Sequence, residues 1–297
     1  MRKIWICGAN GMLGSQFTSL LTSLNLPHIA TCQKQADITD LETVSDLIRT
    51  QKITHVINCA AYTQVDQAEK EQKEAYLVNA IGAHYLAIAS RRHAAKLLHF
   101  STDYVFNGLA TLPYKEDDLC SPIGAYGMSK MMGEMKILAE HPQSVIIRSS
   151  WLFGPFGKNF VSTMVKLMSQ RDEVKVVADQ IGKPTSCLEL AKATLALLDE
   201  EGIFHFANPN ETTWFGFAQE IYRQATDLGF ELKAKKILPI SSQEYPTAAK
   251  RPSYSTLSTE KFEKITAKKI SSWQEALQEY LLSIHPQNQV AAALCRH

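Results

Sequence analysis

Residues 3–14 read KIWICGANGMLG, a short apolar run that leads directly into a G-x-x-G-x-x-G turn and then into an amphipathic segment. Glycines permit a tight turn and let the backbone approach a pyrophosphate closely, and the free N–H groups at a helix N-terminus favour its negative charge. A glycine turn alone is an ordinary connection, but here strand, spacing and helix coincide. We therefore predict a dinucleotide-binding turn at Gly8, Gly11 and Gly14.

The alternation that begins with this turn continues through the first half of the chain. Short apolar runs predict strands that are buried on both faces, and apolar residues at spacings of three and four predict the crossover helices between them. The expected strands are 3–7, 28–32, 55–59, 96–101 and 144–149, and the expected helices are 13–24, 41–50, 74–92 and 126–140. This pattern indicates an α/β fold with a Rossmann-type doubly wound parallel sheet.

After Trp151 the alternation becomes irregular, and glycines and prolines cluster between residues 154 and 184. Helices are expected at 188–198, 213–224 and 273–282, with a strand at 203–206. We predict that residues 1–155 and 186–207 form a dinucleotide-binding domain and that residues 156–185 and 208–284 form a smaller α/β substrate lobe. Residues 285–297 have no periodicity, and we predict a disordered tail.

The overall composition argues against two classes of binding partner, nucleic acids and membranes. In 297 residues, 31 Lys and Arg stand against 30 Asp and Glu, so the net charge of +1 favours neither nucleic acid nor an anionic membrane. No run of about 18 uncharged apolar residues is present, so no membrane-spanning helix is expected. The six cysteines contain no C-x-x-C, which suits a reducing cytoplasm. A small-molecule substrate is the expected partner.

Tyr126 and Lys130 are four residues apart on an expected helix, so they share one face. Reduction of a carbonyl by hydride requires a proton for the developing alkoxide, and a free phenol has a pKa of about 10. An adjacent ammonium would lower that pKa, and it could also hydrogen-bond a cofactor ribose. Such a pair is more often a surface contact, so its significance depends on its neighbours.

A second group of polar residues, Ser101-Thr102-Asp103, follows the expected strand 96–101. The carboxyl ends of parallel strands face the ligand crevice, so a hydroxyl there could hold the oxygen of a substrate carbonyl. Most hydroxyls in such a position only satisfy the backbone of a turn.

In its glycine turn, its Tyr126/Lys130 pair and its Ser101-Thr102-Asp103 segment, the sequence resembles the extended short-chain dehydrogenase/reductase family. The resemblance is strongest to the reductases of dTDP-linked 4-keto sugars in that family. The matching stretches beyond the glycine turn and the Tyr126/Lys130 pair are VINCAAYTQVD at 56–66, Asn79, STDYVF at 101–106, RSSW at 148–151, NFV at 159–161, DQIGKPT at 179–185, TTW at 212–214 and KRP at 250–252. The resemblance implies NAD(P)H-dependent reduction of the C4 carbonyl of dTDP-4-dehydro-6-deoxy-L-mannose to dTDP-L-rhamnose.

The resemblance also implies the roles of single residues. Tyr126 would donate the proton, Lys130 would be its electrostatic partner and ribose contact, and Thr102 would polarise the carbonyl. The implied substrate-binding residues are Thr102, Asp103, Tyr126, Trp151 and Arg251, the last on the diphosphate. The implied cofactor-binding residues are Gly8, Gly11, Met12, Leu13, Gly14, Asp37, Ile38, Ala61, Tyr62, Thr63, Tyr126 and Lys130.

The choice of cofactor is only weakly specified. NAD-selective sites often place an acid about 20 residues beyond the glycines. Residues 31–34 contain no carboxylate, which favours NADPH, while Asp37 keeps NADH open.

Some family members are dimers bridged by magnesium through acidic side chains. Here the corresponding stretch is Ser15-Gln16, and an amide is a weaker ligand for a hard cation than a carboxylate. We assign no metal and leave a homodimer open.

Two other functions are compatible with the same residues. The regulatory subunit of methionine adenosyltransferase, of the beta type, resembles these reductases but acts as a binding partner, and the intact set of Thr102, Tyr126 and Lys130 argues against it. A nucleotide-sugar epimerase, or a reductase of another 4-keto sugar, would use the same scaffold.

Overall fold

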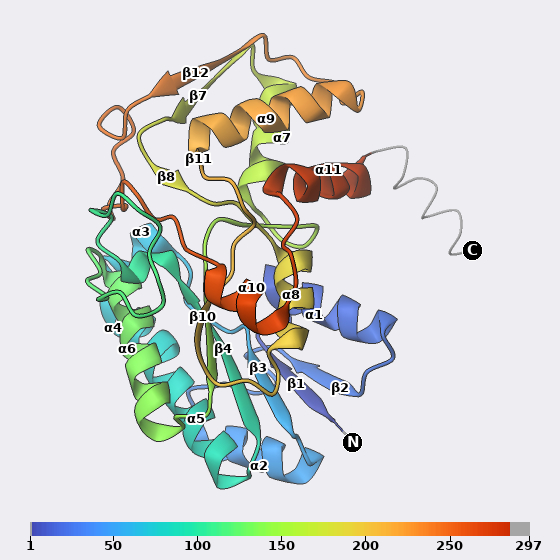
Figure 1. Ribbon diagram of the computed structural model, residues 1–297, viewed down its shortest axis with the longest axis vertical. Coiled ribbons are helices and arrows are strands. Elements are labelled where there is room, and N and C mark those ends of the chain that lie inside the picture. The colour runs from blue at the N-terminus through green and yellow to red at the C-terminus, as the bar shows by residue number, and fades with distance from the viewer. Residues whose placement is uncertain (1, 286–297) are drawn as a thin grey trace.

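The computed structural model describes residues 2–285 and confirms the predicted α/β class, with a six-stranded parallel sheet at its centre (Figure 1). The strands are β1 (Ile4–Cys7), β2 (His28–Thr31), β3 (His55–Asn58), β4 (Lys96–Thr102), β5 (Val145–Ser149) and β10 (Gly202–His205). Their order is β10-β5-β4-β3-β1-β2, and every pairing is parallel. The chain reverses its winding direction between β1 and β3, and a ligand crevice is expected at the carboxyl ends of these strands.

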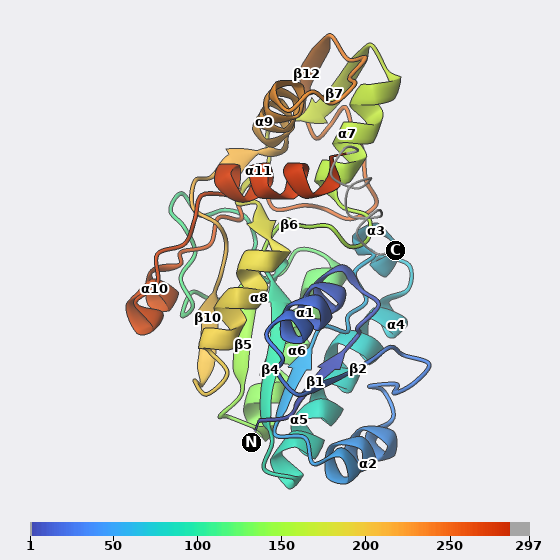
Figure 2. The ribbon, with the colours of Figure 1, turned by 90° about the vertical axis from the view of Figure 1, so that its right-hand side faces the viewer.

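Helices cover both faces of this sheet (Figure 2). On one face lie α1 (Met12–Ser23) and α8 (Cys187–Ala196), and on the other lie α2 (Leu41–Gln51), α5 (Ala83–Arg92) and α6 (Ala125–Glu140). Each face buries its own apolar cluster, with Phe17 and Phe204 in the first and Trp5 and Leu86 in the second. Burial of both faces explains why the strands read as continuous apolar runs.

Several short elements lead into the helices near the crevice. They are α3 (Val65–Ala68), α4 (Gln72–Tyr76), the π-helical segment η1 (Leu77–Gly82) and the 3-10 turn η2 (Asp103–Val105). The helix predicted over 74–92 therefore consists of α4, η1 and α5 in direct succession.

A smaller group of elements lies above the carboxyl ends of the strands in Figure 1. It contains α7 (Phe160–Gln170), β7 (Glu173–Val177), α9 (Trp214–Asp227), β12 (Lys236–Ile240) and α11 (Trp273–Ile284). β7 pairs in parallel with β12, and a separate core with Phe153, Phe217 and Trp273 holds the group together. The short strands are β6 (Leu152–Phe153) with β9 (Thr185–Ser186) and β8 (Ile181–Gly182) with β11 (Thr212–Thr213).

One late helix departs from the expected grouping of the chain. α10 (Glu260–Thr266) packs against β10, and Phe262 and Ile270 belong to the core beneath α1 and α8. The division into two domains at the expected boundaries stays a prediction, and residues 286–297 of the expected tail lie outside the described residues. Among residues 2–285, none of the helices combines the length and the apolar character that crossing a bilayer requires.

Candidate active site

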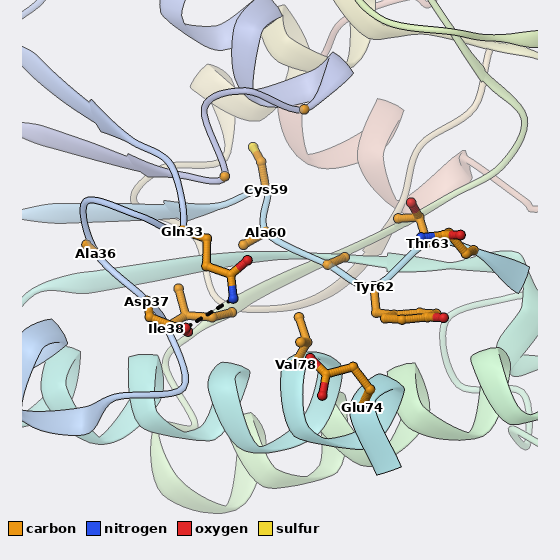
Figure 3. Close-up of a pocket in the computed structure, with 14 residues that line it drawn as sticks. Gln33, Ala36, Asp37, Ile38, Cys59, Ala60, Tyr62, Thr63, Glu74 and Val78 are labelled. Carbon is orange, nitrogen blue, oxygen red and sulfur yellow. Dashed lines mark hydrogen bonds between the residues drawn. The ribbon is translucent and has the colours of Figure 1, made fainter. Parts of the chain in front are cut away.

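A cavity of about 360 Å³ lies at the carboxyl ends of β1 and β3. Seven of the residues predicted to bind the dinucleotide line it: Gly8, Gly11, Asp37, Ile38, Ala61, Tyr62 and Thr63. Figure 3 shows Asp37 and Ile38 toward one end and Tyr62 and Thr63 toward the other. The structure thus brings together segments that follow three different strands, as the rule for doubly wound sheets requires.

The glycine turn has the shape that a pyrophosphate needs. Gly8 has a φ of +72°, and a Cβ there would lie 2.7 Å from the backbone of Ala60, so only glycine fits. α1 then begins at Met12 after Gly11, with no side-chain cap and no acidic residue in its first turn. The first turn of a helix without a cap attracts anions, so these residues fit a dinucleotide. Leu13 is buried in the core, so only its backbone can face a ligand.

Asp37 at the far end of this cavity is held in its ionised form. Although burial opposes it, hydrogen bonds from Thr39 and Gln33 lower the pKa of Asp37. Thr39 donates from its backbone N at 2.9 Å and from its hydroxyl at 2.7 Å, and Gln33 Nε2 donates at 3.1 Å. The Asp37 carboxylate is therefore already occupied by partners from its own loop.

Thr102, Tyr126 and Lys130 lie on β4 and α6, two elements that pack against each other. Thr102 ends β4, Tyr126 lies in the first turn of α6, and Lys130 lies one turn later. The hydroxyls of Thr102 and Tyr126 share a hydrogen bond, and Thr102 Oγ1 donates to Asp103 Oδ1 at 3.0 Å. The contact joins Thr102 and Tyr126, and the shared site of these two residues with Lys130 and their catalytic roles stay a prediction.

The pKa of Tyr126 differs from the sequence-based expectation. Burial, assisted by the charge of Asp103, raises it to about 12, so the phenol stays protonated at neutral pH. Lys130 does not lower it here, because Lys130 Nζ donates to the Phe100 carbonyl at 2.5 Å and lies 3.2 Å from His99 Nε2. Burial also lowers the pKa of Lys130 itself to about 8. A protonated phenol is the form that a proton donor requires.

Asp103 is a buried carboxyl, with only 2% of its surface exposed. Burial raises its pKa to about 6, and the hydroxyls of Ser255 and Thr102 offset part of that effect. Within residues 2–285, its Oδ2 has no hydrogen-bond partner. Buried acids with perturbed pKa values cluster at functional sites.

The site rests on buried polar contacts that the sequence does not reveal. Asn79 Nδ2 donates to Ser129 Oγ at 2.9 Å, and its Oδ1 accepts from the Tyr62 N–H at 2.9 Å, so it ties α6 to the cavity wall. Glu134 pairs with Arg148 at 2.7 Å, and both are buried. Asn58, Asn79 and Arg148 lie in stretches that carry the family resemblance, whereas no sequence signal marks His99 or Glu134.

Trp151 and Arg251 contact other side chains of the protein. Trp151 has a φ of +47°, and its ring stacks on Trp214 with a centroid distance of 3.6 Å. A Cβ at Gly182 would lie 2.7 Å from that ring, which explains the glycine. Arg251 donates to Asp66 through Nη2 at 2.9 Å and through Nη1 at 3.2 Å.

A second cavity of about 1170 Å³ lies beside the smaller group of elements. Four of its lining residues are basic, Arg171, Lys175, Lys250 and Arg251, and Phe160 and Trp214 supply aromatic surface. Trp151 lines neither cavity, so its contact with a sugar stays a prediction. Among residues 2–285, no group of three His, Cys, Asp or Glu side chains is arranged to hold a metal ion.

Comparison with known proteins extends these observations. The model of the family described as RmlD substrate binding domain matches residues 1–285. The chain is 41% identical to the spore coat polysaccharide biosynthesis protein SpsK of Bacillus subtilis, covering 95% of this chain and 97% of that protein. It is 39% identical to a dTDP-4-dehydrorhamnose reductase of Aggregatibacter actinomycetemcomitans, covering 93% and 97% respectively. The solved dTDP-4-dehydrorhamnose reductase of Bacillus anthracis, in complex with NADP, superimposes with a TM-score of 0.90 at 38% identity, covering 95% of this chain and 100% of that one.

Proposed function

The chain belongs to the RmlD substrate binding domain family, and from this premise we propose that it is an oxidoreductase of nucleotide sugars. The proposed reaction is reduction of the C4 carbonyl of dTDP-4-dehydro-6-deoxy-L-mannose to dTDP-L-rhamnose. Relatives named dTDP-4-dehydrorhamnose reductase, 35–39% identical over most of the chain, support this substrate. The relative named for spore coat polysaccharide biosynthesis supports a role in making surface polysaccharide.

One observation carries the proposal. A partly buried phenol that stays protonated at neutral pH, Tyr126, is hydrogen-bonded to the Thr102 hydroxyl at the end of β4, and a cavity that fits a dinucleotide lies at the carboxyl ends of the nearby strands β3 and β1. A reductase needs this combination, because the carbonyl oxygen must be held and then protonated while hydride arrives from the cofactor.

The cofactor and two side chains have separate roles in the proposed reaction. NADPH supplies the hydride when bound, and NADH is the alternative cofactor. Thr102 holds the carbonyl oxygen and Tyr126 gives its proton to the alkoxide as it forms. Binding of NADP by the Bacillus anthracis relative supports the phosphorylated cofactor, and so does the lack of a carboxylate at residues 31–34.

The substrate-binding roles follow from charge and position. We assign the diphosphate to Arg251, which lines the large cavity together with Lys250, a second positive charge. Arg251 must share its guanidinium between the ligand and Asp66. Asp103 and Trp151 are assigned to the sugar.

All five described cysteines are free thiols. Because free thiols suit a reducing compartment, we place the reaction in the cytoplasm.

The test follows NADPH absorbance with purified protein and a panel of nucleotide-linked 4-keto sugars. We expect oxidation of one NADPH per sugar with dTDP-4-dehydro-6-deoxy-L-mannose, and release of the oxidised cofactor. An epimerase would retain its cofactor and show no net oxidation, and a regulatory subunit would bind ligand without turnover. Turnover with a different 4-keto sugar would keep the reaction class and overturn the assigned substrate.

A further inference from the structure

A buried row of polar side chains links the floor of the cavity to Lys130. Asn58 on β3 lies directly opposite His99 on β4 in the register of the sheet. Asn58 Oδ1 accepts a hydrogen bond from the Ala60 N–H at 3.0 Å. The oxygen is the only acceptor of an asparagine side chain, so this contact with a backbone N–H fixes the orientation of Asn58. Its Nδ2 therefore faces His99 Nδ1, at 2.9 Å, as a donor.

The orientation of Asn58 in turn decides the tautomer of His99. His99 is 1% exposed, and this burial by itself holds its pKa well below the ordinary value, so the ring is neutral. A neutral imidazole carries one proton, and Nδ1 must be free of it to accept from Asn58. The proton is therefore on Nε2, which lies 3.2 Å from Lys130 Nζ.

This N–H faces an unsuitable partner if Lys130 is charged. An ammonium has three donors and no acceptor, so His99 and Lys130 would present donors to each other. A neutral amine has a lone pair that accepts from Nε2–H, and it still donates to the Phe100 carbonyl. In a buried site, a contact that favours one protonation state shifts the equilibrium toward that state.

We propose that His99 is a positioning residue which directs its Nε2–H at Lys130 and thereby favours the neutral amine of Lys130 over its ammonium form. The functional meaning of this contact rests on the proposed reductase activity, but the contact itself does not. A lysine whose ammonium form is disfavoured exchanges its proton with solvent closer to the working pH range than a free lysine does.

The other charged groups around Lys130 do not remove this effect. Glu134, one turn further along α6, favours the ammonium, but its oxygens accept from the Arg148 guanidinium on β5 and from the Ser101 hydroxyl on β4. Cys59, which follows β3, is uncharged because burial raises the pKa of its thiol. Asp103 acts on Tyr126, whereas the charged form of Lys130 is opposed by burial and favoured by Glu134 and Cys59.

The test titrates the lysines of the cofactor-free protein by NMR with 13C-labelled lysine, and Lys130→Arg identifies the Lys130 signal. We expect Lys130 to titrate at least about one pH unit below free lysine. In His99→Gln the amide oxygen can accept from the ammonium, so the midpoint should rise by about one unit. His141→Gln is the matched control, since His141 is also buried but bonds the Ala95 carbonyl, and it should leave Lys130 unchanged.

A second measurement uses the unaltered protein and does not depend on whether a variant folds. The 15N shifts of the His99 ring should show a protonated Nε2 and an unprotonated Nδ1. The opposite tautomer, or a Lys130 midpoint that His99→Gln leaves unchanged, overturns the proposal. If turnover is measurable, the pH profile of kcat should move in the same direction as the NMR midpoint. Expected NMR results without turnover would instead count against the proposed reductase activity alone.

Discussion

The effect of Asp103→Asn on the free energy of unfolding should be more favourable above pH 6 than in acid. The side chain is buried, and burial raises its pKa from 3.8 to about 6. Because the folded pKa lies above the unfolded one, the wild-type stability from this group is fully present below pH 3.8 and is lost as the pH rises through 6. The amide cannot ionise, so the variant avoids this loss.

The magnitude follows from the size of the shift. A shift of about 2 pKa units corresponds to about 3 kcal/mol of unfolding free energy lost by the wild type at pH 8, at 1.36 kcal/mol per unit. The same relation gives a loss of about 1.6 kcal/mol at pH 5. The effect of Asp103→Asn on stability should therefore be more favourable at pH 8 than at pH 5 by about 1.4 kcal/mol.

Urea unfolding at the two pH values measures this difference. Any cost of burying the amide N–H₂ at the position of Oδ2 is independent of pH and cancels between them. Asp66→Asn is the matched control, because hydrogen bonding to Arg251 lowers the pKa of Asp66 and keeps it ionised at both values. An Asp103→Asn effect that is equal at pH 5 and pH 8, or larger at pH 5, would refute the reasoning.

Three further substitutions test the assigned roles. Tyr126→Phe should lower kcat by about two to four powers of ten through loss of the proton donor, with unchanged NADPH affinity by titration. Near-normal turnover would remove Tyr126 from this role. Gly11→Val should abolish NADPH binding in a folded protein. A Cβ at Gly11 would lie only 3.3 Å from the Gly8 carbonyl, and the branched side chain would fill the space of the pyrophosphate. Circular dichroism checks the fold, and retained NADPH affinity in a folded variant would contradict the placement of the pyrophosphate at this turn. Arg251→Ala should raise KM for the nucleotide sugar well above its effect on the KM for NADPH, and equal effects on both would disprove the diphosphate contact.

The sequence by itself determined the elements of the fold and the residues that carry local patterns. The strands of the large sheet start and end within a residue or two of their expected bounds. Hydrophobic periodicity is a property of neighbouring residues, so it is readable without the tertiary structure. For the same reason the glycine turn and the shared face of Tyr126 and Lys130 could be predicted from spacing alone. The cofactor residues at 37–38 and 61–63 came from the family resemblance.

Only the tertiary structure decided which groups these residues meet and how they are charged. Asp66 and Arg251 are 185 residues apart in the chain yet form an ion pair, and Asn58 meets His99 because two strands align in one register. The direction of the pKa shift of Tyr126 depends on how deeply α6 buries its first turn and on which partner Lys130 selects. Register, burial and long-range pairing are set by the packing of distant segments, and no local pattern in the sequence encodes them.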